Sequence, residues 1–510
     1  MVLGTILFFY WTAAYRFVLS NDEGIFLDGA RRILNGQAPY RDFFILMGPG
    51  SFWLQALAIK IFGMTLAASR AVTLLDYGVI AGCVFWLVAR RSSPALGAFT
   101  AAVCLILETA DPVVALPNHR WDSAALAMLA VTIVASEASP ALLFLAGACA
   151  AFAAWVTPTV GLVGLALGLY LLWLRRADGI RFAVGGIGIS AVSTAVLAAQ
   201  GALLPLIQQM LWTGSNYSRA NRMPYGSRFG GYGQLFAGSE GGELVVRALI
   251  VFGLTLPAIL PPVVAIVAWL RRREAANLIV VIGAFALLAS AYPRFDVPHL
   301  TYAAPLFYAL LAPEFARFSS NKARVAAFLG TCLLTTLFGG YAVLLRFSET
   351  PILSQVGNIR ASAEDRALIT GLQQRVPRGS TLFVYPYLPV AYFLTLTENP
   401  TRYSYLQPGM MSDHDEQTAL AELEAAPPER VLFFDLPEAQ ILHFWPGSDQ
   451  NRLRMRQIEA FLAQHYRPAS EIKYGSTVFR VLERMSTLAA TRSLPATPSP
   501  EPAQPSRPGR

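Results

Sequence analysis

The sequence predicts an α-helical protein with many membrane-spanning segments, followed by a small α/β domain. Of its 510 residues, 55% are hydrophobic and only 14% are charged, whereas a soluble globular protein carries about 25% charged residues. Apolar segments close to the ~20 residues needed to cross a bilayer recur along residues 1–346. From residue 347 onward, shorter apolar runs alternate with polar residues, as in a soluble domain.

Segments of suitable hydrophobicity define about eleven candidate spans. They are residues 2–19, 67–89, 94–110, 123–137, 140–156, 159–174, 182–204, 247–270, 276–292, 301–313 and 324–345. Several are short for a full crossing, and 301–313 is the weakest because a re-entrant segment has the same composition. The N-terminal segment lacks both a basic start and a small-residue cleavage site, so we expect it to be retained as the first span.

Basic residues set the predicted orientation. They cluster in four short connections, at Arg90-Arg91, Arg175-Arg176 with Arg181, Arg271-Arg272-Arg273, and Arg317 with Lys322 and Arg324. With a cytoplasmic N-terminus, all four lie on the cytoplasmic side, in agreement with the positive-inside rule. Much of the net charge of +8 is thereby explained, and no nucleic-acid partner is expected. The first outer loop (residues 20–66) and everything after residue 346 are then external.

The first outer loop opens with two consecutive acidic residues, Asp22 and Glu23, directly after the first span. A carboxylate pair beside lipid is costly and indicates function; the alternative is a pair of ordinary solvated loop acids. A short amphipathic helix is predicted from Asp28 to a stop at Gly36. A second apolar stretch, Ser51–Phe62, is too short to span and is expected to lie in the membrane interface.

The external domain is predicted at residues 347–485. Helical patterns cover 362–375, 413–425 and 452–466, and strand patterns cover 380–385, 430–435 and 475–482. Ser362 is a suitable N-cap for the first helix. The acidic run Asp413-His414-Asp415-Glu416 resembles a metal site, but a capped helix start is the favoured interpretation. Residues 486–510 are rich in Pro, Ala and Ser and are expected to be disordered.

The four cysteines indicate neither a disulfide framework nor a zinc site. Cys83, Cys104, Cys149 and Cys332 all fall within apolar segments. Burial among helices is therefore expected for each thiol. No Cys/His cluster has the spacing of zinc ligands.

Polar residues that could carry chemistry gather in the outer loops. The site candidates are Asp22, Glu23, Arg41 and Asp42 in the first loop, Asp111, His119, Arg120 and Asp122 in or just after the second, Arg222 in the third, and Arg294, Asp296 and His299 in the fourth. Carboxylates suit base catalysis, and the planar guanidinium group of arginine suits a phosphate. The third loop fits the orientation poorly because it also holds Arg219 and Arg228. One interpretation is that those arginines bind a lipid phosphate. The alternative is that they pair with outer-leaflet headgroups or with nearby glutamates.

Longer stretches resemble a known group. After the Asp-Glu pair come GARRILNGQAPYRDFF (29–44), GPGSFWLQALAIKIFG (48–63) and SRAVTLL (69–75), with PRFDVPHLTYAAP (293–305) and NPTRYSYLQPGMMS (399–412) further on. This pattern resembles the membrane glycosyltransferases of the GT-C class, in the bacterial branch similar to protein mannosyltransferases and the aminoarabinose lipid A transferase. The resemblance covers residues 1–346 and extends more loosely through the external domain.

The resemblance implies transfer of a hexose or pentose from a polyprenyl-phosphate donor to a lipid, glycan or protein acceptor. It places the chain among membrane lipids in a bacterial cytoplasmic membrane, with the C-terminal domain outside. In such enzymes an acidic residue of the first outer loop is catalytic, and Asp22 matches that position. An inverting transfer needs a base to remove the acceptor proton.

The remaining candidates receive roles around that base. Glu23 is expected to support Asp22 or the acceptor, and Arg294, ahead of Arg120 and Arg222, to bind the donor phosphate. Asp296 and His299 are assigned to the site without a role, with helix capping as the alternative. No cofactor is required, although Asp22 with Asp111 or Asp122 offers oxygen ligands for a divalent metal.

Two other functions compete with glycosyl transfer. A transporter or flippase of a lipid-linked sugar would share the spans and the lipid partner. Transporters, however, place ionisable groups near mid-membrane and often show repeated halves, whereas the polar groups here cluster at one face. An assembly protein that uses its outer domain as an adaptor would leave the first outer loop unexplained.

Overall fold

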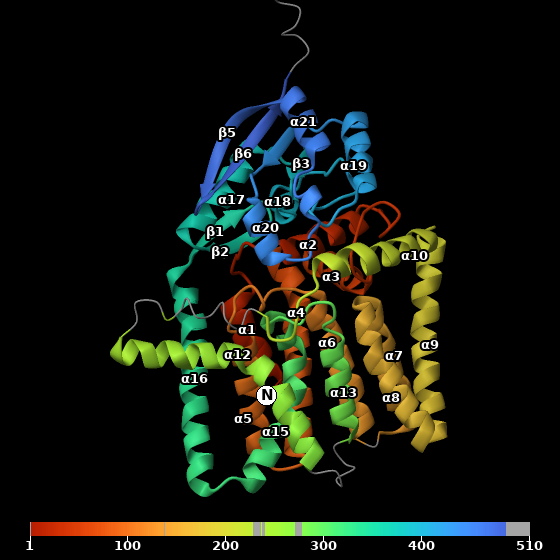
Figure 1. Cartoon of the computed structure of the whole chain (residues 1–510), viewed down its shortest axis with the longest axis vertical. Coiled ribbons are helices and arrows are strands. Elements are labelled where there is room, and N and C mark those ends of the chain that lie inside the picture. Colours follow the sequence, from red (N-terminus) through yellow and green to blue (C-terminus); the bar gives the residue numbers. More distant parts are fainter. Residues whose placement is uncertain (1, 137, 228–235, 237–239, 271–277, 486–510) are drawn as a thin grey trace, which may run out of the picture.

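The computed structural model describes residues 2–136, 138–227, 236, 240–270 and 278–485. A bundle of helices carries a smaller domain with a β-sheet at one end (Figure 1). Three features considered in the sequence lie outside the described residues. These are Arg228, the basic cluster at 271–273 and the tail 486–510.

Every predicted span overlaps a helix, but the helix of the first span ends at Ala13 and not at residue 19. The helices are α1 (Val2–Ala13), α4 (Leu66–Ala89), α5 (Pro94–Glu108), α6 (His119–Ala135), α7 (Pro140–Val156), α8 (Gly161–Leu174), α9 (Arg176–Ala199), α12 (Gly241–Leu270), α13 (Leu278–Ala289), α15 (Ala304–Phe318) and α16 (Asn321–Ser348). Within the described ranges, α4, α9, α12 and α16 are long and apolar enough to cross a membrane, while α1, α5, α7, α8 and α13 are shorter apolar helices. The number of crossings stays a prediction.

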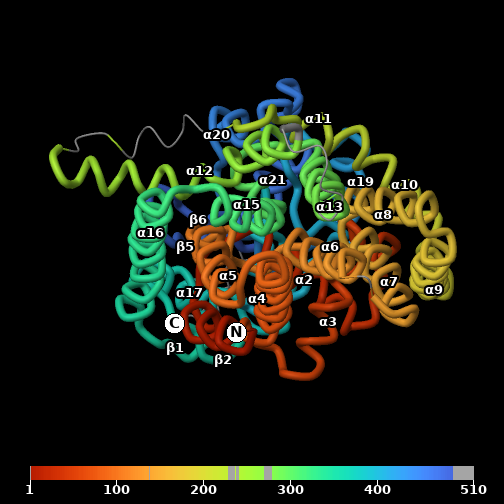
Figure 2. Tube along the Cα trace, turned by 90° about the horizontal axis from the view of Figure 1, so that it is seen from below, coloured from red at the N-terminus to blue at the C-terminus, as the bar shows by residue number. Residues whose placement is uncertain are grey.

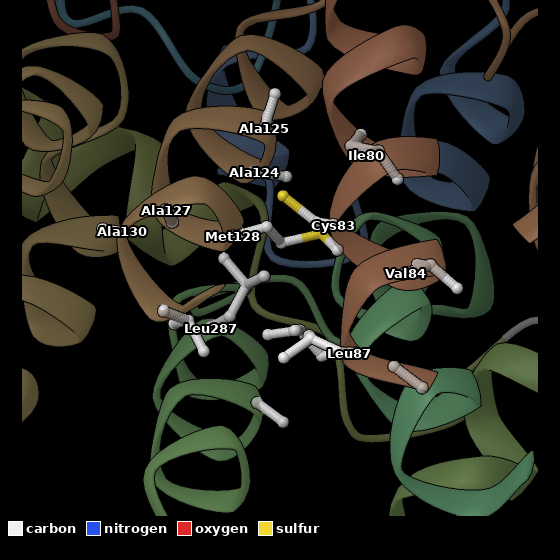
Figure 3. Packing of buried hydrophobic residues seen from close by; sticks show 14 of the residues in the cluster. Ile80, Cys83, Val84, Leu87, Ala124, Ala125, Ala127, Met128, Ala130 and Leu287 are labelled. Carbon is white, nitrogen blue, oxygen red and sulfur yellow. The ribbon is translucent and has the colours of Figure 1, made fainter. Parts of the chain in front are cut away.

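The bundle is built around closely packed neighbours. Seen from below, α5, α4, α6, α7 and α9 follow one another across it, with α16 at one edge (Figure 2). Between α4 and α6, small side chains such as Ala124 and Ala127 let Cys83 and Met128 interdigitate (Figure 3). All four cysteines are free thiols; three are buried as expected, whereas Cys332 is only half-buried.

The first outer loop forms two helices between the bundle and the external domain (Figure 1). They are α2 (Asn21–Leu34) and α3 (Gly50–Phe62). The helix expected from Asp28 begins seven positions earlier, because Ser20 is an N-cap whose side chain accepts a hydrogen bond from the Glu23 amide. Asp22 and Glu23 therefore belong to the first turn of a helix and not to a loop.

The external domain combines a four-stranded sheet with surrounding helices. The sheet has the order β3 (Leu382–Tyr385), β4 (Arg430–Phe433), β6 (Thr477–Arg484), β5 (Tyr466–Tyr474), with β3 and β4 parallel and the other pairs antiparallel. A separate hairpin joins β1 (Thr350–Ser354) to β2 (Gly357–Ala361). The helices are α17 (Ala363–Arg375), α18 (Val390–Thr395), α19 (Asp413–Ala425), α20 (Glu438–Phe444) and α21 (Arg456–His465).

The predicted start of α17 is confirmed, since Ser362 accepts a hydrogen bond from the Asp365 amide at 3.1 Å. The acidic run at 413–416 is likewise a helix start, because Ser412 and Asp415 form a capping box. The sequence did not predict the β1–β2 hairpin or β5. The helical pattern at 452–466 ends at His465, and the chain continues directly as an edge strand.

Shorter elements occupy the remaining connections. They are η1 (Pro158–Val160), α10 (Leu203–Trp212), the π-helical turn η2 (Thr213–Tyr217), α11 (Ser218–Ala220), α14 (Val297–Leu300), η5 (Thr301–Ala303) and η6 (Gln450–Arg452). The segments at 218–223 and 293–302 lie together, because the Met223 amide donates to the Pro293 carbonyl at 3.0 Å. This pairing brings the third and fourth outer loops to one place.

Candidate active site

Asp22 is the accessible member of an otherwise buried helix start. Residues 23–32 of α2 are buried, whereas the Asp22 side chain is exposed. Its Oδ2 accepts a hydrogen bond from Asn118 Nδ2 at 3.0 Å. Protein atoms surround the carboxylate, and this desolvation raises the pKa of Asp22 above its ordinary value, against the opposing charges of Arg294 and Arg120. The carboxylate thus faces an enclosed but solvent-accessible space.

Two buried arginines from different loops flank this space. Arg120, in the first turn of α6, is only 7% exposed, yet its side chain makes no hydrogen bond or ion pair with any described residue. Arg294 is equally buried, but its Nε donates to Asp296 Oδ2 at 2.9 Å and its Nη1 donates to Asn221 Oδ1 at 3.0 Å. Arg120 is therefore a buried cation that lacks a counter-ion contact.

Asp296 and His299 support Arg294 from the fourth loop. Asp296 caps α14, and its Oδ1 lies 2.5 Å from His299 Nδ1. Burial alone would raise the pKa of Asp296, but the contacts with His299 and Arg294 hold it below its ordinary range. Burial lowers the pKa of His299 to about 4 despite the neighbouring carboxylate. At neutral pH, an uncharged His299 therefore donates its Nδ1 proton to an ionised Asp296.

Glu23 points away from Asp22 and into the protein. Its two carboxylate oxygens accept hydrogen bonds from Nε and Nη2 of Arg70, at 2.7 and 2.8 Å, and the Glu23 residue is fully buried. Arg70 Nη1 donates in turn to the Ala13 carbonyl at 2.7 Å. Both carboxylate oxygens of Glu23 are bonded to Arg70, so Glu23 does not contact an acceptor as expected. It positions α2 instead. The pair fixes α2 against α4 and the end of α1.

The other candidates are engaged elsewhere. Arg222 is exposed, and its buried neighbour Asn221 contacts Arg294 instead. Arg41 and Asp42 pair with each other at 2.7 Å on the surface. Asp111 caps a local turn through the Val113 amide at 2.8 Å. None of these contacts joins Arg222, Arg41, Asp42 or Asp111 to Asp22.

Two candidates near the start of α6 are buried in side-chain contacts. Asp122 accepts a hydrogen bond from Ser51 and lies against Asp76, a second buried carboxyl group. His119 Nδ1 lies 2.7 Å from Thr157 Oγ1. Neither group contacts Asp22. Among the residues that the structure describes, no three His, Cys, Asp or Glu side chains are grouped to hold a metal. A divalent metal held by Asp22 with Asp111 or Asp122 stays a prediction.

The structure adds residues that were not among the sequence candidates. Asn118 and Asn221 are the hydrogen-bond partners of Asp22 and Arg294. Tyr302, in η5, lies within electrostatic range of Asp22 and Arg120, and Tyr405 of the external domain lies within that range of Asp22. Asn118 carries a recognisable helix-cap signal ahead of α6. The sequence gives no signal that Tyr405 reaches the first outer loop.

Comparison with known proteins identifies the fold. No protein-family description and no curated protein matches the sequence. The fold is similar to that of ArnT from Cupriavidus metallidurans, which is 13% identical; the match covers 94% of this chain and 97% of ArnT. The TM-score is 0.56 for the ArnT structure without ligand and 0.55 for the one bound to undecaprenyl phosphate. The oligosaccharyltransferase of Archaeoglobus fulgidus is 12% identical, with a TM-score of 0.52 over 89% of this chain and 71% of that protein. The chain is therefore an integral membrane protein with the GT-C fold of these glycosyltransferases.

Proposed function

We propose that the protein is an inverting membrane glycosyltransferase that moves a hexose or pentose from a polyprenyl-phosphate donor to an acceptor. The observation that carries the proposal is the accessible Asp22 carboxylate flanked by two buried arginines, one of which has no counter-ion contact within the described ranges. The undecaprenyl phosphate bound to ArnT, which has the same fold, supports a polyprenyl-phosphate donor.

The chemistry follows from the positions of these groups. Asp22 accepts the proton of the acceptor hydroxyl as its oxygen attacks the anomeric carbon of the donor sugar. The bond between that carbon and the phosphate oxygen breaks on the opposite face, which inverts the configuration. The polyprenyl phosphate departs as an anion, so no separate acid is needed. A buried guanidinium beside the leaving phosphate stabilises the charge that develops there.

Arg120 is the first choice for the donor phosphate. Its guanidinium has all of its donors available, whereas Arg294 already donates to Asp296 and Asn221. Arg294 contributes the second positive charge from a fixed position. Arg222 is exposed and, in the described part of the chain, does not contact the other site residues. This order differs from the sequence-based one, which ranked Arg294 first.

The remaining assignments extend the same proposal. Asp22 belongs to α2, which lies between the bundle and the external domain (Figure 1). With the orientation predicted by the basic loops, this side of the bundle is the outer face of a bacterial cytoplasmic membrane. The acceptor is a lipid, a glycan or a protein that reaches this face.

Transfer of radiolabel from a panel of undecaprenyl-phosphate hexoses and pentoses tests the proposal. Full-length wild-type protein in membranes should release undecaprenyl phosphate and label an acceptor, and Asp22→Asn should lower that rate by about 10²- to 10⁴-fold. Asp42→Asn, which alters an exposed acid of the same loop, is the matched control and should transfer at the wild-type rate. Equal transfer by wild type and Asp22→Asn would refute the role of Asp22. Donor movement across vesicles without transfer would indicate a transporter.

A further inference from the structure

We propose that Tyr405 binds a sugar ring beside Asp22, so that the external domain supplies part of the substrate site. This inference rests on the proposed glycosyl transfer and deepens it. The ligand class is a pyranose or furanose ring, which belongs either to the donor or to a glycan acceptor. Such a ring offers hydroxyl groups to a phenol and an apolar face to an aromatic side chain.

The external domain is fixed directly on the helix that carries Asp22. Gly24, two residues after Asp22, packs against the backbone of Val390, so closely that a Cβ atom at position 24 would overlap it. One turn further along α2, Asp28 Oδ2 accepts a hydrogen bond from Ser404 Oγ at 2.7 Å. Both groups are buried, at 1% and 3% exposure. The position of Tyr405, next to Ser404, is therefore set relative to Asp22.

The arginines of α2 complete the same contact. Arg31 Nη1 donates to the Tyr392 carbonyl at 2.9 Å, and Arg32 Nη2 donates to the Thr401 carbonyl at 3.0 Å. Guanidinium groups that bind main-chain carbonyls hold the docked segment by its backbone and leave its side chains free to point elsewhere. Arg31, Arg32 and Asp28 of α2 thus hold the segment that ends in Tyr405.

Tyrosine hydroxyls in the external domain fall into two groups. Five of them have a hydrogen-bond partner within the domain at 2.9–3.1 Å: Tyr385, Tyr392, Tyr403, Tyr466 and Tyr474. Examples are Asp415 for Tyr403 at 3.1 Å and Glu459 for Tyr385 at 2.9 Å. The hydroxyls of Tyr387 and Tyr405 have none among the described residues. The two rings nevertheless are buried, at 6% and 7% exposure, and contact each other edge to face at 6.2 Å.

The unpaired hydroxyls are not sealed inside the protein. A buried hydroxyl without a partner costs about 1–3 kcal/mol, and Tyr308 in the bundle is such a case. The Tyr387 and Tyr405 hydroxyls differ from that of Tyr308, because they keep some solvent-accessible surface. Tyr405 packs in the same buried cluster as Ile25 and Phe26, which follow Asp22 in α2, and it lies within electrostatic range of Asp22; we therefore place its accessible hydroxyl beside the base.

The surroundings of Tyr405 are aromatic. Tyr387 contacts Trp445 edge to face at 6.0 Å, and Tyr217 of η2 lies near Tyr405. Rings from the external domain and from the third outer loop thus pack in one cluster with Ile25 and Phe26 of α2. Aromatic side chains that combine an apolar face with a free hydroxyl match the mixed polarity of a sugar. In the proposed site, Arg120 and Arg294 bind the lipid phosphate, so these aromatic side chains remain available for a sugar ring.

Tyr405→Phe tests the inference, with Tyr403→Phe as the matched control two residues away. Binding of undecaprenyl phosphate is compared with binding of the undecaprenyl-phosphate sugar that the wild type uses. Tyr405→Phe should keep its affinity for undecaprenyl phosphate and its melting temperature, because no protein hydrogen bond is lost. It should bind the sugar partner about 3- to 10-fold more weakly, and Tyr405→Ala more weakly still. Tyr403→Phe should lower the melting temperature and leave sugar binding unchanged.

The two possible sources of the sugar ring give different results. A raised KM for the donor assigns the ring to the donor, whereas a raised KM for the labelled glycan acceptor assigns it to the acceptor; either supports the inference. Sugar binding and transfer by Tyr405→Phe and Tyr405→Ala at wild-type levels would overturn it while leaving the proposed function intact. A wild-type protein that binds undecaprenyl phosphate but transfers no sugar would overturn the proposed function, and the inference with it.

Discussion

Glu23 and Arg70 form a buried bidentate ion pair directly beside the accessible Asp22, with N···O distances of 2.7 and 2.8 Å. Neighbouring residues of an α-helix point about 100° apart because each turn holds about 3.6 residues. One carboxylate of the pair therefore anchors the helix while the other faces the site. The two acids have different tasks although they are chemically similar and adjacent.

Removing Glu23 should destabilise the protein strongly. Glu23→Ala leaves the Arg70 charge buried without a partner, which costs about 3–5 kcal/mol of unfolding free energy. Asp435→Ala, which breaks the exposed Arg454–Asp435 pair, should cost about 0–1 kcal/mol. Denaturation of the purified variants in detergent measures both. Equal losses for the two variants would show that the Glu23–Arg70 pair does not hold α2.

The pH dependence of transfer should reflect the raised pKa of Asp22. The base works only when ionised, so the rate should rise with pH, with a midpoint above the ordinary aspartate value of 3.8. Initial rates measured across pH 3–8 locate that midpoint. A midpoint at or below 3.8 would contradict the desolvation of Asp22.

The same shift predicts the stability of Asp22→Asn. A folded-state pKa above the unfolded one means that the folded protein binds the proton more tightly, so stability falls as pH rises from the unfolded pKa to the folded pKa. Asparagine does not titrate and avoids this loss. Asp22→Asn should therefore gain stability relative to wild type as pH is raised through this window, and melting temperatures at pH 4 and pH 7 measure the difference. A relative loss of stability over that interval would contradict the prediction.

Arg120 and Arg294 should respond differently to substitution. Arg120→Gln should weaken binding of undecaprenyl phosphate by about tenfold or more, because a hydrogen bond to a charged group contributes about 1.5–3 kcal/mol. It should lower stability less than Arg294→Gln does, because the Arg120 side chain makes no hydrogen bond or ion pair with a described residue and only its packing contacts are lost.

Arg294→Gln should weaken binding and also destabilise the fold. It leaves the buried Asp296 carboxylate and the Asn221 amide without their guanidinium partner, a loss of about 1–3 kcal/mol or more. Ligand titration and thermal denaturation of both variants separate the two effects. A large loss of stability in Arg120→Gln would indicate a structural role instead.

The contact between α2 and the external domain should be sensitive to one methyl group. Gly24→Ala places a Cβ atom against the Val390 backbone, which overpacks the contact at a cost of about 1–3 kcal/mol. Gly188→Ala is the control, because this residue of α9 has no neighbouring atom within 4 Å of a built Cβ. It should be neutral or stabilising by about 1 kcal/mol. Thermal denaturation of both variants provides the measurement.

Short-range patterns in the sequence were enough to predict several elements. The spans follow from hydrophobicity, and each overlaps a helix, although the first helix is shorter than predicted. The starts of α17 and α19 follow from Ser362 and Ser412, whose side chains cap the next turn. The start of α2 was predicted too late, because the Ser20 cap comes directly after an apolar run and the helix appeared to begin with its amphipathic part.

Composition, periodicity and order along the chain by themselves determined a helical membrane protein followed by a small α/β domain, and they predicted that this domain is external. Asp22 became the leading candidate for the base through the resemblance to GT-C glycosyltransferases. Tertiary structure decided which charged groups meet. It paired Glu23 with Arg70, left Arg120 without a counter-ion contact among the described residues and placed Tyr405 near Asp22. Such contacts join residues 47 to more than 350 positions apart, and only packing of the folded chain can select them from many chemically equivalent pairings.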